Sequence, residues 1–198
     1  MIDTALVGLS RFLVGGHPEW VGCEPGPQQR IYFANHGSHL DTVLMWAAIP
    51  KPYRQATHPV AAADYWGKDK FRRSIAIGLL NSVLVNRTGS ATGEDPLAPL
   101  EAELGRGHSL IIFPEGTRGS DALPGAFKSG LFRLAERHPG AELVPVYLEN
   151  LARAFPRGAF LPVPISCRVR FGAPLRLELG EDKTSFLARA RDAVIALA

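Results

Sequence analysis

A strand-to-helix corner is encoded by the stretch IYFANHGSHLD, which occupies residues 31–41. Residues 31–34 are a short apolar run that predicts a buried strand. Residues 40–49 form an apolar segment with good helix formers. Gly37 lies between the two, and Ser38 is a natural helix N-cap with Asp41 in the first turn. The sequence therefore predicts a buried strand, a turn at residues 35–39 and then a helix.

His36 and Asp41 form a candidate catalytic pair at this corner. On one continuous helix they would lie on different faces, because only neighbours three or four positions apart meet. With His36 in the preceding turn, the Asp41 carboxylate can reach back to one ring nitrogen and leave the other free to accept a proton. The alternative is a capping box, in which Asp41 only satisfies free N–H groups of the first turn. Residues 36–41 alone do not decide between them.

Composition limits the class of protein. The 198 residues suit one domain, and a net charge of +3 with no recognisable motif argues against a nucleic-acid partner. Cys23 and Cys167 lack CxxC spacing, which is typical of thiols in a reducing compartment. Asp3 makes a signal peptide unexpected, and no run reaches the length of a membrane span. His39 lacks nearby partners for a metal site, so no metal is expected.

Strands and helices are predicted to alternate along the chain, which favours a single α/β domain with a largely parallel mixed sheet flanked by helices. We divide residues 1–198 into an N-terminal amphipathic helix and loop (1–30), a motif-bearing core (31–150) and a C-terminal strand and helix (151–198). Residues 49–52 are predicted to be a breaker. Further strands are expected at 58–63, 83–85, 109–113, 142–148 and, at an edge, 165–171; helices are expected at 2–13, 96–104, 127–137 and 182–197.

A second motif, FPEGTRG at residues 113–119, follows the strand expected at 109–113. Ligands bind at the carboxyl ends of strands in open α/β sheets. Gly116 and Gly119 allow backbone N–H groups to approach an anion, Arg118 suits phosphate, and Thr117 adds a hydroxyl. Glu115 is expected to pair with an arginine or hold the loop. The alternative is a tight turn with a surface salt bridge.

Basic residues predominate between residues 51 and 87, where seven stand against two acidic residues. This segment is either a solvated face or a surface for anionic headgroups. Lys128 is interpreted as a surface residue that can add positive charge near the Glu115 loop.

The two motifs together resemble those of the glycerolipid acyltransferases, the lysophosphatidic acid acyltransferase family. That family has a histidine and an aspartate separated by four residues, here His36 and Asp41, and a later Phe-Pro-Glu-Gly-Thr-Arg block, here residues 113–118. Arg87, after an apolar strand, matches the arginine of its second block, and Pro145 matches the proline of its fourth block. Gly37-Ser38-His39 departs from a family that often has an aromatic residue after the histidine.

The resemblance implies an O-acyltransferase that moves a fatty acyl group from acyl-CoA or acyl carrier protein to a lysophospholipid hydroxyl, with 1-acylglycerol-3-phosphate as the expected acceptor. His36 and Asp41 would be catalytic. The implied substrate-binding residues are Arg87, Glu115, Gly116, Thr117, Arg118 and Pro145. No cofactor is implied, and the protein is expected in the cytoplasm, peripheral on the inner face of the membrane. A different lysolipid or amino-lipid acceptor, or a catalytically silent lipid-binding protein, remains an alternative.

Overall fold

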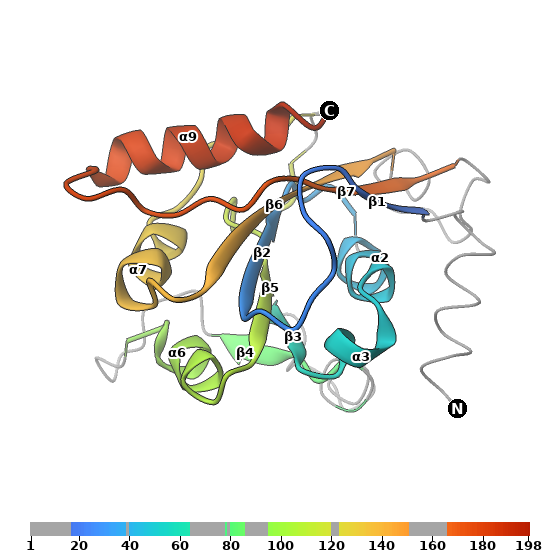
Figure 1. Cartoon of the computed structure of the whole chain (residues 1–198), viewed down its shortest axis with the longest axis horizontal. Coiled ribbons are helices and arrows are strands. Elements are labelled where there is room, and N and C mark those ends of the chain that lie inside the picture. Colours follow the sequence, from blue (N-terminus) through green and yellow to red (C-terminus); the bar gives the residue numbers. More distant parts are fainter. Residues whose placement is uncertain are drawn as a thin grey trace.

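A seven-stranded sheet flanked by helices forms the centre of the computed structural model (Figure 1), which describes residues 17–38, 40–63, 78, 80–85, 95–119, 123–150 and 166–198. The strands are β1 (His17–Trp20), β2 (Arg30–Ala34), β3 (Thr57–Ala62), β4 (Val83–Val85), β5 (Ser109–Ile112), β6 (Glu142–Glu149) and β7 (Arg168–Phe171). Their spatial order is β1-β7-β6-β2-β5-β3-β4. Only the β6–β7 pair among these strands is antiparallel. The predicted α/β class with a largely parallel sheet is confirmed.

β2 lies in the middle of the sheet, and all five of its residues are buried. Successive side chains of a strand point to opposite faces. Accordingly, Ile31 and Phe33 pack into one hydrophobic cluster, and Tyr32 and Ala34 pack into the other. A strand that is covered on both faces needs a continuous apolar run, which is the pattern of residues 31–34.

Helices cover both faces of the sheet. The described helices are α2 (Asp41–Ala48), α3 (Lys51–Arg54), α6 (Ala98–Gly105), α7 (Gly130–Arg137) and α9 (Lys183–Ile195). α2 packs into the Tyr32 cluster, while α6, α7 and α9 pack into the Ile31 cluster on the other face. Figure 1 shows α2 and α3 on one side of the sheet and α6 and α7 on the other, with α9 along the top.

β7 is an inner strand, so the prediction of an edge strand at 165–171 is wrong. β1 lies outside it, and Trp20 of β1 stacks on Phe171 with ring centroids 3.9 Å apart. The apolar and basic alternation of β7 indicated a solvated edge. Instead, acidic side chains on the two neighbouring strands neutralise its arginines.

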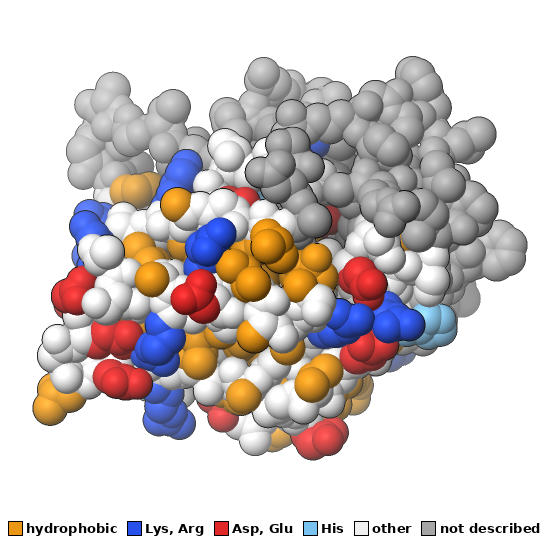
Figure 2. Space-filling view, turned by 90° about the horizontal axis from the view of Figure 1, so that it is seen from above, with side chains coloured by type: hydrophobic (Ala, Val, Ile, Leu, Met, Phe, Trp, Pro, Cys, Tyr) orange, Lys and Arg blue, Asp and Glu red, His pale blue; other side chains and the backbone are white. Residues whose placement is uncertain are grey.

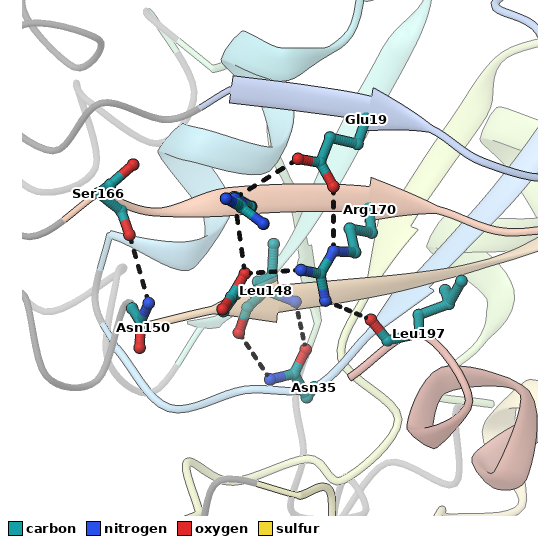
Figure 3. Close-up of polar contacts among 9 residues, drawn as sticks. Glu19, Asn35, Leu148, Asn150, Ser166, Arg170 and Leu197 are labelled. Carbon is teal, nitrogen blue, oxygen red and sulfur yellow. Dashed lines mark hydrogen bonds and ion pairs between the residues drawn. The ribbon is translucent and has the colours of Figure 1, made fainter.

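Arg170 is the centre of this ion-pair network (Figure 3). It donates to Glu19 of β1 and Glu149 of β6, both at 3.0 Å, and to the carbonyl of Leu197 at 2.8 Å. Arg168 lies farther from the same carboxylates, at 3.5 and 3.9 Å. The network joins β1, β7, β6 and the C-terminal end of the chain.

Other local predictions also need correction. The breaker at 49–52 contains the start of α3, where prolines are tolerated because the first turn lacks partners for its N–H groups. β1 lies in the segment 1–30, for which a helix and a loop were expected, and Pro18 is compatible with an edge strand. α7 begins three residues later than predicted, at Gly130. The helix predicted at 2–13 lies outside the described residues.

Most of the basic segment at 51–87 also lies outside the described residues, but Arg54 is described and is buried. Its Nε donates to the carbonyl of Ile49 at 2.9 Å, and its guanidinium lies 5.0 Å from the centre of the Trp46 ring. Arg54 therefore stabilises the α2–α3 connection and does not belong to a solvated face.

The surface around α9 carries both signs of charge. Figure 2, which looks down on the top of Figure 1, shows basic and acidic side chains next to one another with hydrophobic side chains between them. Arg189 of α9, for example, donates to Glu181 at 2.8 and 2.6 Å. Within the described part of the chain, no helix combines the length and the hydropathy that crossing a membrane requires.

Candidate active site

The chain leaves the sheet at Asn35, directly after β2. The Asn35 side chain pairs with the backbone of Leu148 on β6: its Oδ1 accepts from the N–H at 2.8 Å and its Nδ2 donates to the carbonyl at 3.1 Å (Figure 3). The Asn35 side chain thus makes the pair of hydrogen bonds to β6 that a further backbone unit of β2 would otherwise make. The backbone of the next residue, His36, is then available for contacts with the loop that follows β5.

Asp41 fastens the corner with a single oxygen. Its Oδ2 accepts from the backbone N–H of Gly37 at 2.7 Å and of Ser38 at 2.8 Å, and lies 2.8 Å from Nδ1 of His36. The carboxylate is only 1% exposed. The oxygen that closes the turn therefore also contacts the imidazole, as the first of the two interpretations expected.

The prediction that Ser38 is the N-cap of the helix is wrong for α2. The N-cap is Leu40, which lacks a side-chain cap hydrogen bond among the described residues, and Ser38 Oγ accepts from the Leu40 N–H at 3.3 Å. The carboxylate of Asp41 already binds the two N–H groups of the turn, and a charged acceptor makes the stronger hydrogen bonds.

The Asp41 contact determines which nitrogen of His36 can take part in proton transfer. Because a carboxylate accepts, Nδ1 carries the proton of the neutral ring, and Nε2 has the free lone pair. The ring also stacks on Phe113, with centroids 4.2 Å apart and planes 21° apart. His36 remains 21% exposed. The imidazole is thus held in position and still accessible.

The loop that follows β5 is tied to this corner by hydrogen bonds in both directions. Glu115 Oε1 accepts from the His36 N–H at 2.9 Å, and Gly119 N–H donates to the His36 carbonyl at 2.8 Å. The other Glu115 oxygen accepts from Gly125 N–H at 2.8 Å. The Glu115 carboxylate therefore holds the loop in place, which is one of the two roles expected for it.

Gly116 makes the turn in this loop. Its φ is +71°, a conformation that glycine adopts without steric cost, and its N–H donates to the Phe113 carbonyl at 3.0 Å. A Cβ at this position would lie 2.7 Å from Nζ of Lys128. The missing side chain therefore leaves room for the lysine head.

A cavity of about 300 Å³ opens between these elements. Its polar part includes His36, Gly116, Arg118 and Lys128. The rest of its wall is mostly apolar, with Val60, Ala61, Ala62, Val85, Leu97, Leu100, Ile112, Leu131 and Leu134. A histidine, two cationic side chains and an apolar pocket thus share one space.

Lys128 lines the cavity, although the sequence indicated only weakly that it belongs to the site. It is exposed, as expected, but it also borders the cavity, since its backbone N–H donates to the Pro114 carbonyl at 2.8 Å. Its closeness in sequence to the Glu115 loop was the only available signal.

Four of the predicted site residues that the structure describes do not line the cavity: Asp41, Glu115, Thr117 and Pro145. Asp41 and Glu115 instead contact His36, which does line it. Thr117 is exposed. Pro145 is buried in β6, where it pairs with Phe33 and its carbonyl accepts from Gly172 N–H at 2.9 Å. Arg87 lies outside the described residues. Substrate roles for these residues remain predictions.

Comparison with known proteins now adds independent evidence. A family model described as Acyltransferase matches residues 21–149, which is more than half of the chain. A 1-acyl-sn-glycerol-3-phosphate acyltransferase of Limnanthes alba is 27% identical over 174 residues, with 86% of this chain and 59% of that protein covered. A chloroplastic protein of the same name from Arabidopsis thaliana is 32% identical over 131 residues, covering 65% and 34%. The chain thus spans less than two thirds of these relatives' lengths.

Among solved structures, the 1-acyl-sn-glycerophosphate acyltransferase PlsC of Thermotoga maritima has a similar fold. The TM-score is 0.76 at 18% sequence identity, covering 98% of this chain and 76% of that chain. At this identity the likeness supports the fold, and the family model adds the motif-bearing region, which contains both His36 and Arg118. The chain belongs to the acyltransferase family.

Proposed function

We propose that this protein transfers a fatty acyl group from the thioester of acyl-CoA or acyl carrier protein to the free hydroxyl of 1-acylglycerol-3-phosphate, giving phosphatidic acid. The observation that carries the proposal is the shared cavity, in which an imidazole oriented by a buried carboxylate stands with two cations and an apolar wall. The names of the relatives from Limnanthes and Arabidopsis support the choice of acceptor.

His36 acts as the general base. Its Nε2 takes the proton of the acceptor hydroxyl, and the oxygen attacks the thioester carbonyl carbon. The tetrahedral intermediate then collapses with cleavage of the C–S bond, and the proton on His36 neutralises the departing thiolate. Asp41 stabilises the transient imidazolium through Nδ1. This chemistry requires no metal or cofactor, since the leaving thiolate is a weaker base than the attacking alkoxide.

The acceptor phosphate binds at Arg118 and Lys128, which supply positive charge at the cavity. Glu115 does not oppose this binding strongly, since both of its oxygens accept hydrogen bonds from backbone N–H groups. The acyl chain of one substrate occupies the apolar wall formed by β3, α6 and α7. Holding both substrates in one space supplies part of the rate acceleration. Because the acceptor and the product are lipids, we place the reaction at the cytoplasmic surface of a membrane.

A thiol-release assay with acyl-CoA, with and without lysophosphatidic acid, tests the proposal. We expect acceptor-dependent release, and His36→Ala should lower kcat at least about 100-fold. Arg118→Ala should raise the acceptor KM more than the donor KM, whereas Arg133→Ala, at an exposed arginine of α7, should change neither.

Different outcomes would point to different functions. Wild-type turnover in the His36→Ala protein would refute the assignment of the base. Release with another lysolipid but not with lysophosphatidic acid would change the acceptor. Lipid binding without any release would favour a catalytically silent lipid-binding protein.

A further inference from the structure

Two histidines and a glutamate meet at the opposite end of the strands from the proposed active site. His58 is the second residue of β3, His108 directly precedes β5, and Glu103 is on α6. β3 and β5 are parallel neighbours, so these residues lie near the amino ends of the strands, while Phe113 follows the carboxyl end of β5. None of the three is among the described residues that line the cavity.

His58 has a buried ring nitrogen that lacks a hydrogen-bond partner among the described residues. The side chain is 5% exposed, and its Nδ1 donates to the carbonyl of Asn81 at 2.8 Å. Nδ1 therefore carries the proton, and Nε2 is an acceptor that receives no hydrogen bond from any described residue. A buried acceptor left without a donor is unfavourable. The nitrogen that a metal ion would use is thus buried, and the described part of the chain offers it no donor.

Glu103 and His108 lie close to the His58 ring. Oε2 of Glu103 lies 2.7 Å from Nδ1 of His108, and the rings of His108 and His58 have centroids 4.5 Å apart. One ligand atom from each of the three residues lies within 4.8 Å of the others. The other Glu103 oxygen accepts from Arg106, which is 62% exposed, so solvent screens its positive charge.

We propose that His58, Glu103 and His108 bind a divalent transition-metal ion of the zinc type. Zinc accepts two imidazoles and a carboxylate and keeps a fourth position for water. Bonds of about 2.0–2.1 Å at tetrahedral angles put ligand atoms about 3.4 Å apart, so small side-chain rotations from the present spacing suffice. On metal binding, the hydrogen bond between Glu103 and His108 is replaced by two metal–ligand bonds, and the neutral His108 ring carries its proton on the nitrogen that does not bind the metal.

The surroundings match those of a metal-binding histidine. Such a histidine usually donates its second ring N–H to a carboxylate or a backbone carbonyl, which is the contact between His58 and Asn81. Asn81 has a φ of +50°, a conformation that asparagine adopts more readily than most residues. The ion would join α6 to β3 and β5. Leu97, which precedes α6, and Leu100, which is in α6, both line the cavity, so the bound ion would also stabilise the cavity wall.

Metal binding to the purified, chelator-treated protein tests this proposal without an activity assay. Calorimetry with Zn²⁺ should give one ion per chain, and Co²⁺ should give the visible absorption of a tetrahedral nitrogen and oxygen site. Both signals should be lost in His58→Gln and in His108→Gln. They should persist in His17→Gln, which changes an exposed histidine of β1, and in His36→Gln.

Zn²⁺ should also raise the Tm of the wild-type protein and of the two controls, but not of the site variants. Circular dichroism of each variant checks that it folds; should His58→Gln fail to fold, His108→Gln and Glu103→Gln at the more exposed ligands serve instead. Absence of stoichiometric binding in the wild type would overturn the proposal, and so would binding that is lost only in His36→Gln.

Discussion

Replacing Asp41 by asparagine separates its two roles. The wild-type carboxylate orients His36 and closes the turn before α2 with the same oxygen. Asparagine has nearly the same shape and retains one acceptor, so the backbone N–H groups of Gly37 and Ser38 keep a partner. The carboxylate charge is lost, and the amide NH₂ takes one of the two oxygen positions. Oδ1 is buried without a hydrogen-bond partner among the described residues, so an NH₂ there would be unsatisfied.

The expected effects follow from these contacts. A hydrogen bond to a charged group contributes about 1.5–3 kcal/mol and a neutral one about 0.5–1.5, so three weakened contacts amount to roughly 3 kcal/mol. Removing a buried charge offsets part of this loss. We expect a net destabilisation of about 1–2 kcal/mol, or a Tm about 2–8 °C lower for a domain of this size. In contrast, kcat should fall about 10²- to 10⁴-fold, because a neutral amide no longer stabilises the imidazolium that forms when His36 takes the proton.

The assay measures kcat and Tm on the same preparations, with Asp182→Asn as the matched control. Asp182 also accepts from two backbone N–H groups at a helix start, those of Thr184 and Ser185, but within the described part of the chain it makes no hydrogen bond to a histidine. The control should lose stability and keep its activity. If Asp41→Asn lowered Tm but kept kcat within about threefold of wild type, the carboxylate would serve the turn only, and the proposed orientation of His36 would be refuted.

Two further predictions concern stability. Arg170→Gln should lower Tm more than Arg168→Gln. Arg170 is 18% exposed and makes contacts of 2.8–3.0 Å, whereas Arg168 is 50% exposed and its contacts are 3.5 Å or longer. Equal losses of Tm in thermal melts would contradict this ranking. Burial raises the pKa of the Cys167 thiol from its usual 9.0 to about 11. As the pH rises, this thiol therefore ionises in the unfolded chain before it ionises in the folded protein. Stability should therefore be full below pH 9 and decline toward pH 11, and Cys167→Ala should show a smaller decline in Tm over that range.

Several elements were predictable because their signals are local. The strands expected at 58–63, 83–85, 109–113 and 142–148 overlap β3, β4, β5 and β6, since each is a short apolar run bounded by polar residues, glycine or proline. The C-terminal helix begins where Asp182 offers its carboxylate to the first turn. Such signals depend on a few consecutive residues, so they can be recognised without knowledge of the rest of the fold.

The errors arose where distant residues outweighed a local pattern. The alternation of apolar and basic residues in β7 is typical of an edge, but Glu19 and Glu149 come from strands far away in sequence and neutralise the arginines. Pairing partners of this kind cannot be read from the residues on either side.

The α/β class, and the possibility that Asp41 contacts His36, follow from the residues alone, because a tight turn within five positions keeps the two side chains near each other. In contrast, the residues alone do not show that Arg118 and Lys128 border the same cavity as His36, or that His58 lies next to Glu103 and His108; the folded structure shows both. Those contacts depend on which strands are neighbours in the sheet. Strand order results from the packing of the whole chain, and no short stretch of residues specifies it.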